Sequence, residues 1–109
     1  MNPPSPADRN PAGPVAQEVW LMPVFIPSPD RAAELRTALH ELQQTSRKDP
    51  GCIEYSVYEA DGRFVLIEGW DSRADLESHN EQAHVQEFVG SSAYLLAEPF
   101  TVARIIPVS

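Results

Sequence analysis

The pattern of apolar and polar residues along the chain predicts four strands separated by helices. Apolar runs of strand length lie at 19–26, 52–59, 64–70 and 100–108. Between the first two runs, apolar residues recur every three or four positions, which predicts an amphipathic helix. Helical signals return after Ser72 and again over 82–91. The resulting order, β-α-β-β-α-β, predicts an α+β fold of the ferredoxin-like kind, with one four-stranded antiparallel sheet and its helices on one face.

Prolines and glycines predict where these elements begin and end. Ser28-Pro29-Asp30 predicts the start of the first helix, with Ser28 as its N-cap, and Asp49-Pro50-Gly51 predicts its end. Asp61-Gly62 suits the tight turn of a hairpin between the second and third strands. Because proline has no N–H to donate, Pro23 and Pro27 predict that the first strand lies at a sheet edge or that they mark a strand end.

Composition and charge narrow the class of protein. Five of the eleven prolines lie within the first 14 residues, which predicts a flexible tail over 1–15 and a single domain over 16–109. Sixteen acidic and eight basic residues give a formal net charge of -8, which disfavours binding to nucleic acid or to anionic membranes. A single cysteine, no secretory signal and no apolar run of about 20 residues predict a cytoplasmic protein without a membrane span.

The third strand is apolar on both faces. Val65 and Ile67 alternate with the larger apolar residues of the same run, so both faces should be covered. With helices on one side only, we expect the other side to expose a larger apolar patch than monomers usually show. Its predicted members are Phe64, Leu66, Trp70, Phe100 and Val102. This patch predicts a homodimer in which two sheets face each other, or a lid that covers the same surface.

Several short motifs along the chain are shared with a known family. They are Asp49-Pro50-Gly51-Cys52 leading into Tyr55, Glu68-Gly69-Trp70, Asp71-Ser72-Arg73, His79, and His84-Val85-Gln86-Glu87-Phe88. With these motifs, residues 17–108 resemble the antibiotic biosynthesis monooxygenase family, which includes small quinol monooxygenases. The resemblance implies a dimeric α/β barrel with one pocket per subunit, roofed by the second helical region. It also implies oxidation of electron-rich phenols or quinols by dioxygen with no flavin, metal or other cofactor.

Three ionisable side chains are the candidates for catalysis. His79 and His84 can accept a phenolic proton near neutral pH. Glu68 shares a strand face with Trp70 and would have a raised pKa if that face is covered. On one continuous helix the two histidines would point about 140° apart, unless the helix breaks between them. This spacing argues against a helical site of the HExxH type, so no metal ligand is predicted.

A further set of side chains is predicted to contact a small aromatic substrate. They are Trp70, Tyr58, Trp20, Asn80 and Phe88. Trp70 suits the wall of a pocket, but an ordinary core or interface tryptophan explains it equally well. For Glu68, an ion pair with Arg104 is the alternative to a role in proton transfer. The resemblance also disfavours haem, because His79 and Val89 stand where haem-degrading relatives have a tryptophan and the axial histidine.

Three functional hypotheses remain open from the sequence. The leading one is a cofactor-independent monooxygenase that acts on a small aromatic quinol or a polyketide-like phenol. The second is a non-catalytic dimeric barrel that binds a small molecule, which an entirely apolar pocket would favour. The third is an isomerase or cyclase on the same fold, in which a histidine or Glu68 shifts protons without oxygen. The mass of the product separates the first hypothesis from the third.

Overall fold

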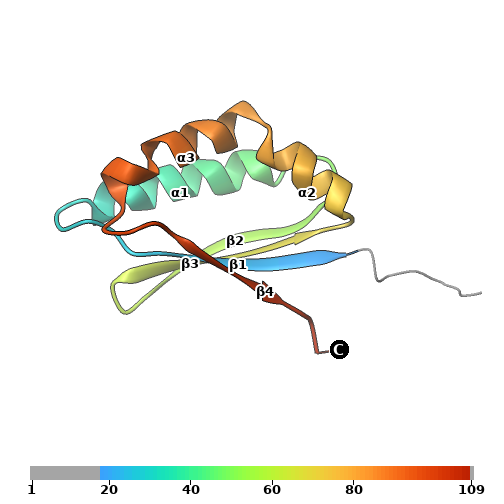
Figure 1. The fold of residues 1–109 in the computed structure, drawn as a ribbon, viewed down its shortest axis with the longest axis horizontal. Helices are drawn as coiled ribbons and strands as arrows, with labels where there is room; N and C mark the ends of the chain where they lie inside the picture. Colours follow the sequence, from blue (N-terminus) through green and yellow to red (C-terminus); the bar gives the residue numbers. More distant parts are fainter. Residues whose placement is uncertain (1–17, 109) are drawn as a thin grey trace, which may run out of the picture.

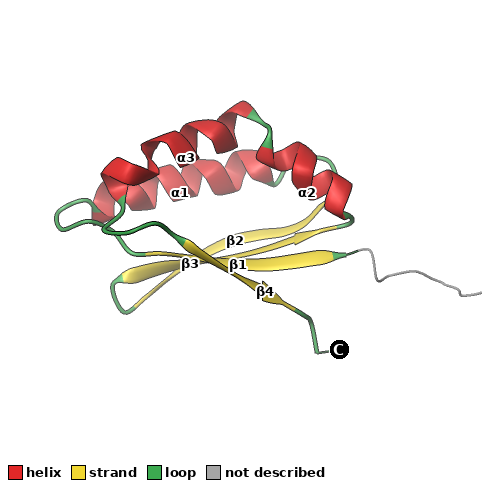
Figure 2. Ribbon diagram, in the orientation of Figure 1, coloured by secondary structure: helices red, strands yellow, loops and turns green. Residues whose placement is uncertain are grey.

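A computed structural model describes residues 18–108, so the tail predicted over 1–15 lies outside the described residues. The strands are β1 (Val19–Phe25), β2 (Cys52–Ala60), β3 (Arg63–Trp70) and β4 (Thr101–Ile105), and the helices are α1 (Ala32–Ser46), α2 (Arg73–Asn80) and α3 (Ala83–Leu95). The strands form one antiparallel sheet in the order β2-β3-β1-β4. All three helices lie on one face of this sheet (Figures 1 and 2). The predicted ferredoxin-like α+β fold is therefore confirmed. Within the described part, no helix is long and apolar enough to cross a membrane.

The core lies between the sheet and the helices. α1 contributes Leu35, Leu39 and Leu42, whose spacing of three and four residues places them on the helix face that meets the sheet. Along β3, every second residue beginning at Phe64 is buried on this side. α3 closes the core with Phe88, which packs edge-on against the ring of a β1 phenylalanine at 5.5 Å between centroids. Burial of each such side chain contributes about 1.5–3 kcal/mol to the free energy of unfolding.

The prediction for the helix-free face was wrong about which residues it carries. Phe64, Leu66 and Trp70 lie beneath the helices and are at most 2% exposed. Phe100 packs against the same core, and Val102 lines a cavity on the helix side. The helix-free face instead carries the alternate residues of the two central strands, namely Trp20, Met22, Val24, Val65 and Ile67. Because β3 is apolar on both faces, its sequence could not show which face the helices cover.

Pro23 lies inside a central strand, although its missing N–H predicted a sheet edge or a strand end. β1 has β3 on one side and β4 on the other. Its pairing with β4 continues through Met22 and Pro23, whereas its pairing with β3 passes from Leu21 directly to Val24. The gap falls where proline cannot donate a hydrogen bond. β1 therefore accommodates Pro23 by losing part of its pairing with β3 while its pairing with β4 stays continuous.

The first helix begins later than predicted. α1 starts at Ala32 rather than at Pro29, because Asp30 adopts a left-handed φ of 68°. The backbone N–H of Arg31 donates to the carbonyl of Ser28 at 3.0 Å, so Ser28 closes a turn ahead of the helix instead of capping it. Ser28 and Pro29 therefore form a turn that precedes α1, and not the first residues of the helix.

Two local predictions are confirmed. Asp61 and Gly62 have φ values of 53° and 79°, the left-handed pair that a tight hairpin turn requires between β2 and β3. Ser72 caps α2, since its hydroxyl accepts a hydrogen bond from the backbone N–H of Asp75 at 3.1 Å. In both cases the determining interactions lie within four residues of sequence.

Candidate active site

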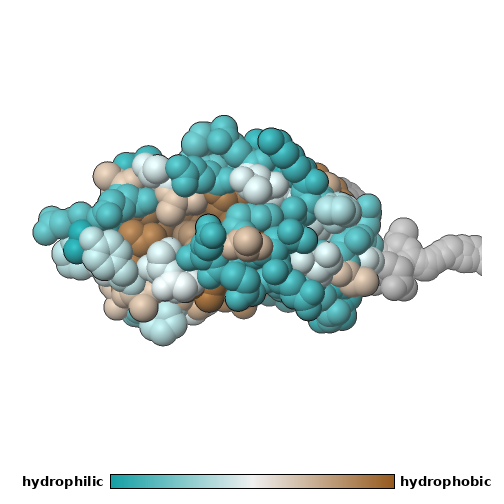
Figure 3. All heavy atoms as spheres, turned by 90° about the horizontal axis from the view of Figure 1, so that it is seen from above, coloured by the Kyte–Doolittle hydropathy of each residue, from teal (hydrophilic) through white to brown (hydrophobic). Residues whose placement is uncertain are grey.

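A cavity of about 300 Å³ lies between the helix-covered face of the sheet and the α2–α3 region. Most of its walls are apolar, with Leu66 of β3 and Phe88 of α3 among them. Seen from the helix side, apolar atoms are recessed between hydrophilic side chains (Figure 3). The polar or ionisable side chains in its lining are Tyr55, Glu68, His79, Asn80 and Gln86. An apolar cavity of this size with a few polar groups is typical of a small-molecule site.

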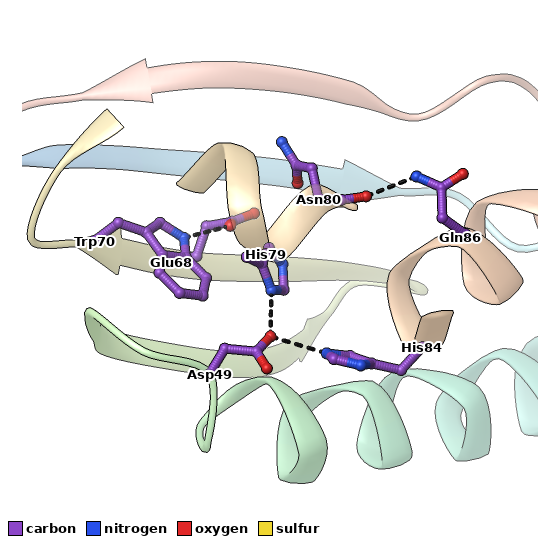
Figure 4. A network of polar contacts seen from close by, with 7 residues as sticks. All are labelled: Asp49, Glu68, Trp70, His79, Asn80, His84 and Gln86. Atoms are coloured by element: carbon purple, nitrogen blue, oxygen red, sulfur yellow. Dashed lines mark hydrogen bonds and ion pairs between the residues drawn. The ribbon is translucent and has the colours of Figure 1, made fainter. Parts of the chain in front are cut away.

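Glu68 and Trp70 form a buried pair at the end of β3. They are two residues apart and therefore share a strand face, and the indole Nε1–H donates to Glu68 Oε1 at 2.8 Å (Figure 4). Burial raises the pKa of Glu68, and the hydrogen bond from Trp70 opposes this in part. Among residues 18–108, Glu68 and Arg104 form no ion pair: they lie on two strands that β1 separates, and Glu68 is instead hydrogen-bonded to Trp70. The alternative of such an ion pair is therefore wrong.

His79 and His84 meet at one carboxylate oxygen. His79 Nδ1 lies 2.8 Å and His84 Nε2 lies 2.9 Å from Oδ2 of Asp49 (Figure 4). An ionised carboxylate only accepts hydrogen bonds, so each of these two nitrogens carries a hydrogen. A neutral His79 in this tautomer has its free lone pair on Nε2, and its ring lines the cavity. This is the arrangement of an oriented general base.

A break between α2 and α3 makes this convergence possible. α2 ends at Asn80 and α3 begins at Ala83, and the N–H of Gln82 folds back to the carbonyl of His79 at 3.0 Å. On one continuous helix the two histidines would point apart, so this break allows both to reach Asp49. Asp49 arrives from the turn that ends α1, two residues before a glycine with a φ of 81°. The turn that ends the first helix therefore also supplies the carboxylate.

The ring of His79 is enclosed by other aromatic rings. Its centroid lies 4.4 Å from that of Trp70 and 5.4 Å from that of Tyr55, and the residue is only 2% exposed. Burial lowers the pKa of His79, Asp49 opposes this through its hydrogen bond and charge, and the charge of His84 lowers the pKa further. The lowered pKa favours the neutral form of the ring, which is the form that can accept a proton.

Asp49, His79 and His84 also offer three donor atoms that lie within 4.8 Å of one another. The two contacts to the carboxylate are 2.8 and 2.9 Å long, which are ordinary hydrogen-bond lengths. In a tetrahedral zinc site with ligands about 2.0–2.1 Å from the ion, neighbouring ligand atoms would lie farther apart, at roughly 3.3 Å, and each nitrogen would turn a lone pair rather than a hydrogen towards the ion. We therefore interpret the cluster as a hydrogen-bond network. The remaining walls of the cavity offer apolar contacts to an organic ligand.

The structure brings part of the sequence-predicted set to the cavity. Its lining includes Glu68, His79, Asn80 and Phe88. Trp70 is fully buried behind the cavity wall, where it contacts Glu68 and His79. His84 lines a separate groove between α1 and α3.

Trp20 and Tyr58 lie away from the cavity. Trp20 is on the helix-free face, where its ring covers Gly69 and its indole N–H donates to Glu18 at 3.1 Å. Tyr58 is 55% exposed on the edge strand β2. Both residues alternate along their strands with residues that point to the helices, so the geometry of one subunit does not place either beside the other candidates.

Three residues of the site were not among the sequence candidates. Asp49 was interpreted only as a helix end, although it stands in one of the family motifs. Tyr55 was noted only as part of the same motif and as a residue of the second strand. Gln86 donates its side-chain N–H to the carbonyl of Asn80 at 2.6 Å and so ties the start of α3 to the end of α2 beside the cavity. The motif residues were the signal that could have found them.

Comparison with known proteins assigns the chain to a family. The profile described as "Antibiotic biosynthesis monooxygenase" matches residues 22–91, a range that contains Asp49, Glu68, His79 and His84. The chain belongs to this family. The resemblance inferred from the motifs is thereby confirmed.

Relatives and solved structures agree with this assignment. The chain is 35% identical to "Putative monooxygenase YcnE" of Bacillus subtilis over 79 residues, 70% of this chain and 83% of that protein. It is 39% identical to "Uncharacterized protein sll1783" of Synechocystis over 74 residues, 65% of this chain but only half of that protein. The structure of Rv0793 from Mycobacterium tuberculosis superposes with a TM-score of 0.79 at 30% identity, covering 84% of this chain and 96% of that one.

Proposed function

We propose that this family member is a monooxygenase that oxidises a small electron-rich aromatic compound, a quinol or a polyketide-like phenol, with dioxygen and without a bound cofactor. The observation that carries the proposal is the His79–Asp49 pair at the wall of a largely apolar cavity. His79 Nε2 takes the phenolic proton, while Asp49 holds the ring in the correct tautomer and stabilises the imidazolium that forms.

The electrons for the reaction come from the ionised substrate. Loss of the phenolic proton makes the ring a stronger reductant, and it transfers electrons to dioxygen. A bond forms between one oxygen atom and a ring carbon, and the O–O bond then breaks. One oxygen stays on the ring as a quinone carbonyl. The other leaves as water, which takes up the phenolic hydrogen and the hydrogen of the attacked ring carbon. Glu68, a buried carboxyl with a raised pKa, can donate or accept a proton in the second step.

The apolar walls serve this chemistry in two ways. Phe25, Phe88 and Phe100 form a cluster in the cavity wall, with centroids 5.5 and 5.1 Å apart around Phe25. Such rings orient a flat aromatic substrate through offset or edge-on contacts. They also exclude water from the ionised substrate and from reactive oxygen intermediates.

An isomerase or cyclase is the second candidate. Two proton-carrying groups, Glu68 and His79, line one cavity, and such a pair can move a proton between two atoms of a substrate without oxygen. The non-catalytic binder is less well supported. It would be favoured by an apolar pocket with Glu68 paired to Arg104 and both histidines in solvent, whereas His79 is 2% exposed and Glu68 binds Trp70.

The functional unit that we propose is a homodimer formed through the helix-free faces of two sheets. In the described part of the chain no helix or strand covers this face (Figure 1). Its residues Met22, Val24, Val65 and Ile67 are only partly buried in one subunit. A second copy would remove this apolar surface from water, and each Å² buried contributes about 25 cal/mol of favourable free energy to association.

Oxygen consumption tests the proposed reaction. The purified protein is incubated with a panel of hydroquinones and naphthoquinols, and oxygen uptake and ¹⁸O incorporation are followed. We expect uptake above the spontaneous rate, and a loss of about 100-fold or more on changing His79 to Ala. The matched control is His40→Ala, on the exposed face of α1. No uptake with any substrate, or equal uptake by both variants, would overturn the proposal, and a product of unchanged mass would favour the isomerase.

A further inference from the structure

Two hollows approach the Asp49 network from different sides. The cavity described above is lined by His79, and a groove of about 320 Å³ between α1 and α3 is lined by His84. Leu42 and Phe88 line both hollows and form an apolar partition between them. The hydrogen-bonded series His79, Asp49 and His84 is a polar connection across this partition (Figure 4).

Exposure increases along this series from the cavity to the groove. The side chains of His79, Asp49 and His84 are 2%, 12% and 22% exposed. The rings of Trp70 and Tyr55 pack against the ring of His79, at 4.4 and 5.4 Å between centroids. A proton taken up by His79 is therefore poorly connected to solvent, whereas His84 can exchange protons with solvent directly.

The two rings share one negative charge. Both bind the same oxygen of Asp49, and their centroids are 5.9 Å apart. One carboxylate can balance one imidazolium, so a second positive charge on the other ring is repelled in this partly desolvated site. In agreement with this repulsion, the charge of His84 lowers the pKa of His79. Protonation of one histidine thus favours deprotonation of the other.

We propose that His84 is the proton outlet of the active site: when His79 takes a proton from the substrate, a protonated His84 releases one into the groove. The substrate O–H bond breaks and an Nε2–H bond forms on His79. The Nδ1–H bond of His84 then breaks and its proton passes to solvent. The His79–Asp49–His84 group keeps its total charge, and the substrate remains as an anion. Asp49 keeps both hydrogen bonds throughout and need not be protonated.

Other ionisable groups surround the pair. They are Glu41 of α1 and Glu87 of α3 beside His84 in the groove, Tyr55 of β2 and Glu68 of β3 beside His79 in the cavity, and Cys52 near Asp49. Burial raises the pKa values of Tyr55, Glu68 and Cys52, which disfavours their charged forms. Glu41 and Glu87 are exposed acidic residues that line the groove together with His84.

The test compares His84→Gln with His40→Gln. Glutamine at position 84 can still donate an N–H to Asp49 but cannot take up a proton, and His40 is an exposed histidine outside the network. The probe is 4-nitrophenol, whose coloured phenolate reports ionisation without oxidation. Calorimetry at about pH 6, in two buffers of different ionisation enthalpy, counts the protons released on binding. Chemical shifts of the histidine rings give the titration curve of His79 in the free proteins.

In the wild type and in His40→Gln, each nitrophenol molecule that binds and ionises at a subunit with a charged His84 should release about one proton to solvent. His84→Gln should bind the phenolate with almost no release, and its His79 should titrate at higher pH because the repulsion is gone. Equal release in all three proteins, or an unchanged His79 titration in His84→Gln, would overturn the proposal. So would a stoichiometric divalent metal in the purified protein, since it would occupy the nitrogens that face Asp49.

The inference rests on the proposed oxidation for its biological role, but its measurement needs no oxidation. If hydroquinones are not oxidised and the coupled titration is still found, the proton outlet stands and the monooxygenase proposal fails. If oxidation occurs and the titrations are uncoupled, the monooxygenase proposal stands and the proton outlet fails. If the probe binds without ionising, the His79 titration alone decides.

Discussion

Replacing Asp49 by Asn removes one negative charge between His79 and His84 and leaves the side chain almost the same size. The wild-type oxygen accepts two hydrogen bonds of 2.8 and 2.9 Å and is largely buried. Hydrogen bonds to a charged group contribute about 1.5–3 kcal/mol each, against about 0.5–1.5 kcal/mol for neutral ones. The asparagine oxygen can still accept, so the expected loss is about 1 kcal/mol per bond and about 2 kcal/mol in total.

This loss should be measurable as a fall in melting temperature. For a domain of this size, 1 kcal/mol corresponds to roughly 4–8 °C, so Asp49→Asn should melt on the order of 10 °C below the wild type. Asp61→Asn is the matched control, because Asp61 is exposed in the hairpin turn and has a φ of 53° that asparagine also tolerates. It should change the free energy of unfolding by less than about 0.5 kcal/mol.

The same substitution should change the chemistry of His79. Asp49 opposes the effect of burial on the pKa of His79, so its neutralisation should lower that pKa further. Without the carboxylate, the ring is free to carry its hydrogen on Nε2, which is the wrong tautomer for a base that faces the cavity. Turnover of an accepted quinol should fall by about 10²–10⁴-fold. Nitrogen chemical shifts of His79 report the tautomer. An unchanged tautomer together with a melting point within 2 °C, on the order of 0.5 kcal/mol, would refute the reasoning.

Three further predictions follow from single positions. Burial raises the pKa of Glu68 in the folded protein above its value in the unfolded chain, so the contribution of Glu68 to the free energy of unfolding is lost as pH rises through the folded pKa. In urea titrations, Glu68→Gln should therefore be more stable relative to the wild type at pH 7 than at pH 4. Gly51→Ala should lower the free energy of unfolding by at least about 1–2 kcal/mol, because a left-handed φ strains alanine and the added Cβ would also collide with the Asp75 carboxyl. Gly90→Ala in α3 meets open space and should raise the free energy of unfolding by about 0.5–1 kcal/mol. Ile67→Arg on the helix-free face should give monomers in light scattering, and an unchanged mass would exclude this face as the dimer interface.

The parts of the fold that the sequence predicted correctly depend on local interactions. The alternation in β3, the left-handed pair at Asp61 and Gly62, and the cap at Ser72 each involve residues a few positions apart. The helix-free face was assigned wrongly because both faces of β3 are apolar. Only the packing of α1 and α3 against Phe64 and Leu66 decides which face is covered. Pro23 was misjudged because a central strand can lose part of one ladder and keep the other.

The site shows the same division between local and distant interactions. Glu68 and His79 could be proposed from residue type and position, since a strand face and a helix stripe are local patterns. The role of Asp49 could not, because its partners lie 30 and 35 residues away in sequence. Whether His79 and His84 converge depended on a break in the helix. Neither glycine nor proline marks that break, since Glu81 and Gln82 stand between α2 and α3.

Trp70 shows how the core and the site depend on each other. The sequence left two interpretations of this residue, a pocket wall or an ordinary core tryptophan. With 0% exposure it has no surface left for a ligand, yet it donates a hydrogen bond to Glu68 and stacks on His79 at 4.4 Å. It is therefore a core residue that positions both ionisable groups of the cavity. Changes that loosen the packing around it should disturb the geometry of Glu68 and His79 before they unfold the domain, because catalytic groups tolerate displacements of only about 0.5 Å.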